Sequence, residues 1–354
     1  MPRLLSHGLR CSLRVLHRRR TRGTAAARAM DPAVYFGRDP ATVRRLAADG
    51  HAVAEFQWAM RLIGGVGVAR NPREAAVWMQ RAAAQGYAAA QCELGGWLKL
   101  GVGVPRDATQ AVAWTRRAAE AGHAMAQYNL CICYRDGDGV AVDAAIAATW
   151  LRRSADQGDA MAQYELGICY QQGLGVPRDD RQAFRLYRLA ADQGHALAQN
   201  YLGNCYEQGV GTAVDHAAAA RLWRLAADKG IGKAQHNLGC CYASGKGVAV
   251  DHAASVRYCT MAARQGYAES QYQVGNAYSN GKGVERDVAA AVSWWHKAAA
   301  QGYVVAQYNL GVCYANGTGV DLDVAAAALW FRKAATQGLA PAIAALAQID
   351  ARRR

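Results

Sequence analysis

Cysteine and histidine have the widest chemical range of the side chains in this sequence, since they bind metals, exchange electrons and act as nucleophiles. The chain has ten cysteines and nine histidines among 354 residues. Cys240 and Cys241 are neighbours, and together with Cys259 they form a candidate redox or metal site. Neither a CxxC spacing nor a nearby histidine supports such a site, so the sequence favours it only weakly.

Five of the ten cysteines, Cys241 among them, stand at one phase of a 36-residue interval. They are Cys133, Cys169, Cys205, Cys241 and Cys313. In stacked repeats, neighbouring members of such a row lie farther apart than the Cα separation of about 4.4 to 6.8 Å that a disulfide requires. We therefore expect free thiols that serve as small buried hydrophobic groups in a reducing compartment.

The histidines follow the same interval, which argues against a metal centre. His51, His123 and His195 share one phase, and His216 and His252 share another. Metal ligands must converge on one point, and residues in register on stacked repeats do not. We expect these histidines at the surface or at helix caps, and we predict no metal site and no cofactor.

Motifs that mark an enzyme are missing from the sequence. No GxSxG, HExxH or EF-hand pattern occurs, and the glycine-rich stretch at 275–283 has the wrong spacing for a phosphate-binding loop. No nucleophile has an evident aligned base. The sequence therefore predicts a protein without enzymatic activity and without catalytic residues.

A period of 36 residues organises the whole chain between residues 51 and 338, where eight complete units fit. The same step links seven glutamines from Gln91 to Gln307 and six tyrosines from Tyr134 to Tyr314. It also links nine glycines: Gly50, Gly86, Gly122, Gly158, Gly194, Gly230, Gly266, Gly302 and Gly338. Internal repetition at this length is typical of stacked supersecondary units.

Each unit reads as two short helices, which we name helix A and helix B. In one unit, helix A covers 124–136, has apolar residues three and four apart, and ends at Gly137. Helix B begins after a phased acid that can cap its first turn: Asp107, Asp143, Asp179, Asp215, Asp251, Asp287 or Asp323. In the first unit Asn71 followed by Pro72 takes this role.

One such pair of helices cannot bury its apolar face alone, so the units must stack into a solenoid. We predict an all-α, α/α superhelical solenoid of eight helix-turn-helix repeats with a half-repeat cap at each end. Residues 1–30 form a basic amphipathic segment, 31–50 an N-terminal capping helix, 51–338 the eight units, and 339–354 a C-terminal capping helix with a basic tail.

The unit AxAQYxLGxxYxxGxGVxxDxxxAxxWxxxAAxxG resembles the Sel-one-like repeat (SLR), a relative of the tetratricopeptide repeat, eight times over. The resemblance implies an α/α superhelix and an adaptor or scaffold that binds partner proteins, without indicating which. Departures are mild: Glu55 replaces the phased glutamine, Thr212 replaces a turn valine, and Leu62 and Leu98 replace the tyrosine. The cysteine pairing of bacterial members is absent, because the Ala-Ala phase of helix B carries no cysteine.

If helix A lines the inner surface, as in tetratricopeptide arrays, the resemblance indicates a groove for a partner segment. Tyrosine offers rigid amphipathic area and asparagine bonds both ways to a peptide backbone. The expected groove residues are Tyr128, Tyr164, Asn200, Asn204, Glu207, His236, Tyr272, Asn276, Tyr308 and Asn316, with Arg135 nearby. The alternative is that half of these tyrosines pack against the next repeat.

Net charge is +14, but the first thirty residues carry eight arginines and no acid, which leaves +6 for the rest. A nearly neutral body lacks the clustered cations of a nucleic-acid-binding surface. No run of eighteen apolar residues occurs, so we predict no transmembrane segment. The sequence does not indicate an oligomeric state.

On a helix, four arginines of the N-terminal segment fall on one side and four of its leucines on another. Arg3, Arg10, Arg14 and Arg18 oppose the row that includes Leu5 and Leu9. This pattern is typical of a mitochondrial transit peptide. The alternatives are a disordered basic tail, a nuclear-import run, or a start site misplaced upstream of Met30, with a cytoplasmic or nuclear location.

The favoured function is a non-enzymatic interaction scaffold that binds a protein or peptide on its concave helix A surface. One alternative is a cysteine-rich mitochondrial assembly factor with a redox or metal role. A less favoured one is a hydrolase acting on cell-wall or β-lactam-like substrates, an activity that the resemblance implies for some bacterial members.

Overall fold

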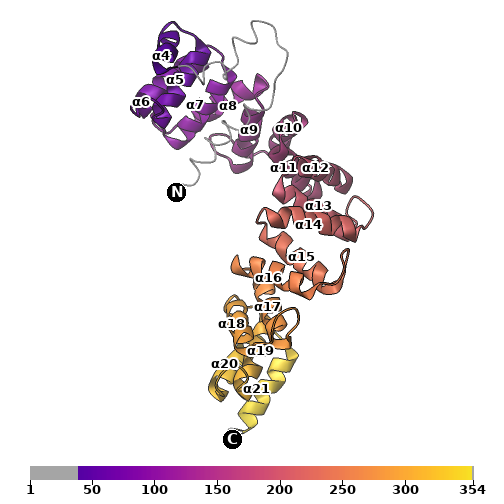
Figure 1. Ribbon diagram of the computed structural model, residues 1–354. Coiled ribbons are helices and arrows are strands. Elements are labelled where there is room, and N and C mark those ends of the chain that lie inside the picture. The colour runs from indigo at the N-terminus through magenta and orange to yellow at the C-terminus, as the bar shows by residue number, and fades with distance from the viewer. Residues whose placement is uncertain (1–38, 353–354) are drawn as a thin grey trace. The chain divides into compact units, whose positions relative to one another are not determined.

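The computed structural model describes residues 39–352, which form eighteen α-helices and no strand. Figure 1 shows these helices as successive antiparallel pairs. The predicted all-α solenoid fold is confirmed. The chain divides into two compact units, one up to Pro177 and one from Arg178 onward. The N-terminal segment 1–30 and residues 31–38, predicted as part of the capping helix, lie outside the described residues.

The first unit contains one lone helix followed by three helix pairs and the A helix of a fourth. These are α4 (Pro40–Ala48), α5 (Ala52–Gly64), α6 (Pro72–Ala84), α7 (Ala88–Leu100), α8 (Ala108–Glu120), α9 (Ala124–Asp136), α10 (Ala144–Asp156) and α11 (Ala160–Gln172). Odd-numbered helices are A helices and even-numbered helices are B helices. Each contacts the next one along the chain within this unit.

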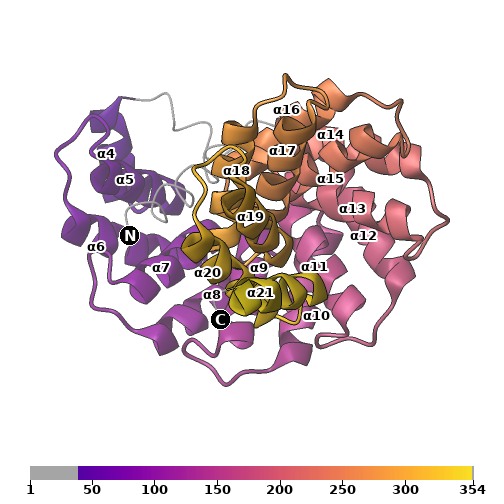
Figure 2. The ribbon, with the colours of Figure 1, turned by 90° about the horizontal axis from the view of Figure 1, so that it is seen from below.

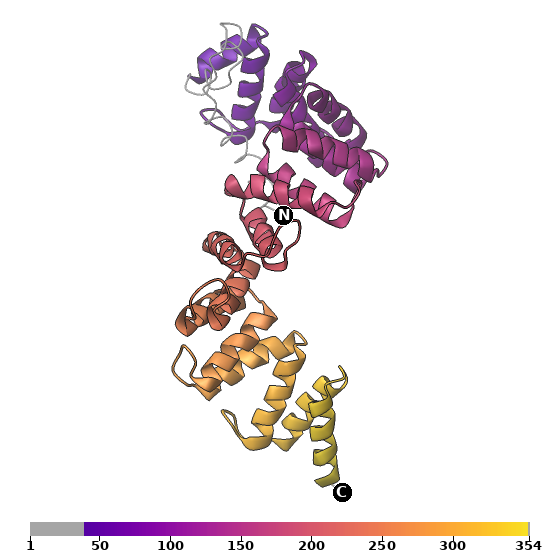
Figure 3. The ribbon, with the colours of Figure 1, turned by 90° about the vertical axis from the view of Figure 1, so that its right-hand side faces the viewer.

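The second unit begins with the B helix of the fourth pair and ends with a lone A-like helix. Its helices are α12 (Asp180–Asp192), α13 (Ala196–Gln208), α14 (His216–Asp228), α15 (Gly232–Ser244), α16 (His252–Arg264), α17 (Ala268–Asn280), α18 (Val288–Ala300), α19 (Val304–Asn316), α20 (Val324–Ala335) and α21 (Ala340–Arg352). Within this unit, Figure 2 shows α12, α14 and α16 in one layer and α13, α15 and α17 in another. In Figure 3 the orange and yellow helices of this unit follow one another in chain order.

The predicted helix ends are present in the structure. Helix α9 spans Ala124–Asp136, and Gly137 ends it in the left-handed conformation with φ 74°. Asp143 starts α10 by accepting a 2.9 Å hydrogen bond from the Ile146 amide, a cap that stabilises a helix by about 1 kcal/mol. His123 and His195 cap the A helices in the same way through Nδ1, as expected of cap residues.

The second glycine of each turn contacts the preceding repeat. A Cβ added to Gly139 would lie 2.1 Å from the carbonyl oxygen of Ala108, the first residue of the preceding B helix. Since φ at Gly139 is also 76°, both space and backbone conformation favour glycine. The sequence predicted a bend here, and the structure adds a contact between repeats.

Buried glutamines join the helices across repeats. Gln127 is 4% exposed, and its Nε2 donates to the Ala119 carbonyl at the end of the preceding B helix (3.1 Å). Its Oε1 accepts from Gln157 Nε2 at the end of the following B helix (2.8 Å), and that amide also bonds to the Gly122 carbonyl. One side chain thus connects three successive helices.

The first repeat departs from this arrangement at Glu55, whose carboxylate is acceptor-only. Its side chain is fully buried, Arg81 Nε lies 3.0 Å from Oε1, and Gln85 Nε2 donates to Oε2 at 2.7 Å. Burial raises the pKa of Glu55, and the charge of Arg81 opposes that rise. The preceding helix α4 therefore packs on α5 without the glutamine-to-carbonyl bond found in later repeats.

No helix among residues 39–352 is long and apolar enough to cross a membrane.

The contacts between A and B helices involve small residues. The first alanine of each Ala-Ala pair in α6, α8, α14 and α16 has no exposed surface. Alanine at these positions lets the backbones of neighbouring helices approach closely, and packed helices generally lie about 8 to 10 Å apart.

Adjacent glycines in α7 provide a matched test of this close packing. A Cβ on Gly95 would lie 2.3 Å from Thr115 Oγ1 and 3.0 Å from the Ala111 carbonyl oxygen, whereas a Cβ on Gly96 would have no atom within 4 Å. Gly95→Ala should lower the unfolding free energy by about 1 to 3 kcal/mol through overpacking. Gly96→Ala should leave it unchanged or raise it by up to about 1 kcal/mol.

Urea unfolding followed by circular dichroism measures both variants against wild type. Equal midpoints for the two variants would contradict the close contact between α7 and α8.

Candidate functional site

The first row of predicted groove residues lies largely between successive A helices. Tyr164, Asn200 and His236 are 8%, 4% and 8% exposed, so their side chains offer little area to a partner. Tyr128 donates from its hydroxyl to Glu165 Oε1 of the next A helix (2.5 Å), and burial is the main cause that raises its pKa. The predicted row therefore acts mainly in packing between repeats, the alternative stated for the tyrosines.

The last two tyrosines of that row are half-buried and pack against aromatic rings. Tyr272 lies with its ring 5.0 Å from that of Tyr303, and Tyr308 lies 5.6 Å from the ring of Phe331. Both keep part of their surface open. They stay candidates for partner contact through the part of each side chain that is exposed.

The second predicted row is more accessible. Asn204, Glu207 and Asn276 are half-buried, and Asn316 is exposed at the end of α19. Asn204 Oδ1 and Asn276 Oδ1 accept hydrogen bonds at 3.2 Å from the indoles of the same repeat's B helix, Trp223 and Trp295. Arg135 pairs with Asp136 and Glu165.

Within the second unit, Asn204 and Glu207 open onto a pocket of about 440 Å³. Residues of α13 and α15 line it, together with Trp223 of α14, which is only 5% exposed. Further lining residues are Gln208, His216, Ala219, Lys233, Asn237, Cys240, Cys241, Ser244 and Lys246. We call this the α13/α15 pocket.

Polar groups in the α13/α15 pocket are partly satisfied and partly free. Asn237 Nδ2 donates to Asn204 Oδ1 (3.3 Å), which leaves Asn237 Oδ1 and Asn204 Nδ2 without a hydrogen bond among the described residues. Lys246 Nζ pairs with Glu207 Oε1 at 2.7 Å, and Lys233 Nζ lies 3.3 Å from Glu269 Oε2. The pocket thus offers one amide acceptor, one amide donor and two exposed ammonium groups.

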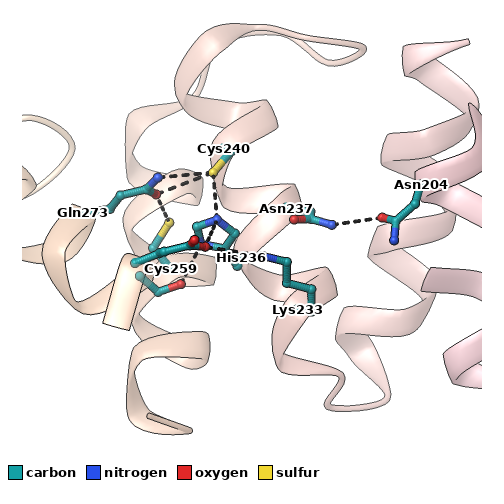
Figure 4. Close-up of polar contacts among 9 residues, drawn as sticks. Asn204, Lys233, His236, Asn237, Cys240, Cys259 and Gln273 are labelled. Carbon is teal, nitrogen blue, oxygen red and sulfur yellow. Dashed lines mark hydrogen bonds and ion pairs between the residues drawn. The ribbon is translucent and has the colours of Figure 1, made fainter. Parts of the chain in front are cut away.

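A cluster of thiols and imidazole borders the pocket (Figure 4). His236 and Cys240 lie one helical turn apart on α15, with Nε2 3.7 Å from Sγ. Gln273 of α17 donates from Nε2 to Cys240 Sγ (3.3 Å) and accepts from Cys259 Sγ at Oε1 (3.1 Å). Ser270 Oγ lies 2.8 Å from His236 Nδ1.

The expectation that no histidine lies near these cysteines was wrong. The His-x-x-x-Cys spacing at 236–240 places both side chains on one helical face, and this signal was present in the sequence. The second predicted partner, Cys241, is buried and lies apart from the Gln273 contacts. The structure therefore joins Cys240 to Cys259 through Gln273.

The electrostatics of the cluster favour neutral groups. Burial raises the pKa of Cys240, and it raises that of Cys259 to about 12. Burial is also the largest cause that lowers the pKa of His236, helped by the charge of Lys233 and opposed by that of Glu269. At neutral pH the pair is thiol and imidazole, so the geometry supports a hydrogen-bonded packing cluster and not an activated nucleophile.

Other cysteines of the described chain are free, and most are buried. Cys133, Cys205, Cys241 and Cys313 are 2% to 6% exposed, while Cys169 is half-buried. Residues 39–352 contain no group of three or more His, Cys, Asp or Glu side chains that could hold a metal ion.

Sequence reasoning missed several residues of the pocket and cluster, among them Lys233, Asn237, Lys246 and Gln273. The signal that identifies Asn237 and Gln273 lies one residue after the predicted phase. At that step the residues are polar or tyrosine in every unit from the second to the eighth: Glu93, Asn129, Glu165, Tyr201, Asn237, Gln273 and Asn309. A row that stays polar beside a buried row indicates the accessible edge of the A helices.

The paired antiparallel helices, the phased caps and the glutamine connections define a repeat protein of the α/α solenoid class. The Sel1 repeat model matches eight times without a gap, at residues 52–87, 88–123, 124–159, 160–195, 196–231, 232–267, 268–303 and 304–339. The chain belongs to the Sel1 repeat family. These bounds differ by one residue from the predicted 51–338.

Two solved structures resemble the chain over most of its length. A protective antigen of uropathogenic Escherichia coli that displays an SLR fold is 34% identical, with a TM-score of 0.85 over 89% of this chain and 68% of that one. A Sel1 repeat protein from Oxalobacter formigenes is 32% identical, with a TM-score of 0.66 over 91% and 93%. No curated protein matches the chain significantly.

The pKa shifts of the cluster lead to a prediction for thiol reactivity. In the native protein, iodoacetamide should label Cys240 slowly near pH 7, because the raised pKa of the thiol keeps it protonated. Labelling should accelerate only above roughly pH 8.5, where a free cysteine ionises. His236→Ala should not move this rise to higher pH, since the neutral imidazole does not hold a thiolate.

Peptide-resolved mass spectrometry of labelled protein separates Cys240 from the other thiols, and the unfolded chain gives the reference rate. Rapid labelling near pH 7 that disappears in the His236→Ala variant would contradict the neutral pair and would point to nucleophilic chemistry.

Proposed function

We propose that this protein is a non-enzymatic interaction scaffold that binds an extended segment of a partner protein along its A helices. Repeat solenoids generally present such surfaces to other proteins. The observation that carries the proposal is the α13/α15 pocket, where Asn204 Nδ2 and Asn237 Oδ1 have no hydrogen bond among the described residues. Open amide groups in a pocket are suited to a peptide backbone.

The pocket is suited to a polar partner segment in which at least one side chain carries a carboxylate or an amide carbonyl. An amide donor and an amide acceptor within one pair of asparagines match the C=O and N–H of a single extended residue. Lys233 and Lys246 are exposed at its border, although each already has a carboxylate near its ammonium group. We expect the asparagines to fix the register of the segment and the lysines to bias its charge.

Asn276 and Asn316 extend the proposed surface into later repeats. Asn276 repeats the indole contact of Asn204 two repeats further on, and Asn316 is exposed at the same end of its A helix. Tyr272 and Tyr308 add the exposed parts of their half-buried side chains. Affinity would come from a few such anchors and not from total contact area.

An enzymatic role has less support. The side chains of His236 and Cys240 are in contact, and their pKa shifts oppose an ion pair. No observation favours a redox, metal or hydrolytic activity over the scaffold. We therefore propose binding as the function of the site.

Obstruction of the pocket tests the proposal. Ser244 is exposed at its border, and its hydroxyl bonds to carbonyls of its own helix, so Ser244→Trp adds bulk with little loss of packing. Combined with Asn237→Ala, it should weaken partner capture about tenfold or more, as expected for the loss of an anchor. Gln172→Trp, at the same phase on α11 and also exposed, is the matched control.

The measurement is quantitative mass spectrometry of proteins cross-linked to each variant in cells. Partners enriched by wild type and by Gln172→Trp should be lost from the pocket variant. Retention of every specific partner by all three proteins would remove the pocket from the function.

The N-terminal segment carries a separate proposal, mitochondrial import. Its acid-free pattern of arginines and leucines supports this location, with cytoplasmic and nuclear sites as alternatives. The full chain should colocalise with mitochondria, and a chain that starts at Met30 should not. Imaging of both versions fused to a C-terminal fluorescent protein tests this, and identical distributions would contradict it.

A further inference from the structure

The outer faces of the B helices differ between repeats in a regular way. One phase holds tryptophan at 78, 114, 150, 294 and 330, and the residue three positions later is then a cation: Arg81, Arg117, Arg153, Lys297 or Lys333. In each of these five repeats the cation lies over the indole ring, 4.0 to 4.6 Å from its centroid. These cations are already engaged within their own helix.

Three consecutive B helices, α12, α14 and α16, replace this pair. The cation becomes Leu189, Leu225 or Met261, and the residue four positions earlier becomes Arg185, Arg221 or Arg257. The other five repeats have Val, Ala, Thr, Ser or Leu at the arginine phase. Arginine and the apolar residue therefore change together, and only in three adjacent repeats.

These six residues form a surface that we call the outer strip, and all belong to the second unit. Leu189, Leu225 and Met261 are 41%, 49% and 38% exposed. Residues i and i+4 are neighbours on a helix, so each exposed arginine lies one turn before an exposed apolar side chain. Repetition on three helices produces a basic row beside an apolar row.

The arginines of the outer strip are less engaged than those of the other repeats. Arg185 and Arg221 have no ion pair or hydrogen bond among the described residues, and Arg257 lies over the ring of Tyr258 at 5.1 Å. On the far side of the apolar row the same helices carry Asp192 and Asp228. Arg264 takes that phase in α16.

We propose that the outer strip binds an acidic amphipathic helix of a partner protein, which crosses α12, α14 and α16. Its carboxylates would face Arg185, Arg221 and Arg257, and its apolar side chains would cover the leucines and the methionine. Asp192 and Asp228, beyond the apolar row, would repel acidic side chains of the partner helix. They would therefore orient its acidic edge toward the arginines.

Charge and exposure favour this partner over a lipid surface. The apolar residues expose half or less of their side chains, too little to enter a bilayer, and Asp192 and Asp228 would be repelled by anionic headgroups. Three arginines beside an apolar row also differ from the continuous basic surface that nucleic acids select. The α13/α15 pocket is lined by His216, Ala219 and Trp223 of α14, but none of the six residues of the outer strip lines it, so the inference is independent of the proposed function.

Selection from displayed libraries of random helical peptides about 14 to 28 residues long tests the proposal, since a rise of about 1.5 Å per residue then covers spans of about 20 to 40 Å. The full-length protein is the target. Peptides selected on wild type should be amphipathic, with acid along one edge of an apolar face. Arg185→Glu/Arg221→Glu/Arg257→Glu should bind them roughly tenfold more weakly or worse. Leu189→Ser/Leu225→Ser/Met261→Ser should do the same.

Two controls keep the result specific. Arg45→Glu/Arg73→Glu/Arg106→Glu makes the same change of net charge on exposed arginines of the first unit and should bind like wild type. Ser244→Trp, which obstructs the α13/α15 pocket, should also bind like wild type. Circular dichroism confirms that each variant is folded.

Selected peptides without an acidic edge, or equal binding by wild type and the arginine variant, would overturn the proposal. Binding of phosphatidylserine-containing vesicles that depends on the three arginines, with no such peptide selected, would assign the strip to a lipid surface instead and would equally overturn it.

Discussion

The phased glutamine buried in seven of the A helices makes the interaction on which the array depends. Its donor satisfies a carbonyl at the end of the preceding B helix in all seven repeats that carry it. In five of them its oxygen also accepts from a glutamine or lysine at the end of the following B helix. Since an unpaired amide buried at this depth would cost about 1 to 3 kcal/mol, both partners must lie in place at once.

This constraint determines which neighbouring side chains are available for binding. With the glutamine directed between repeats, the next residue along the helix is also drawn toward the interface, which buries Tyr164, Asn200 and His236. The residue after that, represented by Asn237, reaches the α13/α15 pocket. Consecutive residues on a helix differ by about 100° of rotation. That step separates the row of His236, which packs between repeats, from the row of Asn237, which is available for binding.

The sequence predicted the periodic features well because each has a local physical cause. Asp143 caps a helix and Gly137 ends one through interactions confined to a single turn, and their recurrence every 36 residues made the assignment redundant. The candidate site was predicted less well. Which face of an A helix contacts the next repeat depends on the packing angle between helices, and the contact of Cys240 with Gln273 joins residues of different repeats. Neither follows from phase alone.

The second glycine of each turn contacts the preceding repeat, so the contacts between repeats all run in the same direction along the chain. Gly139 contacts the carbonyl of Ala108, and Gly247 contacts that of His216. Each such turn therefore packs against the start of the B helix in the preceding hairpin. Each 36-residue unit contains both contact elements: a turn glycine that packs on the unit before it, and a B-helix start on which the turn of the next unit packs. Duplication or loss of one complete hairpin would preserve each remaining junction, whereas a gain of half a hairpin would not, and a lineage can therefore lengthen or shorten such a protein in whole steps.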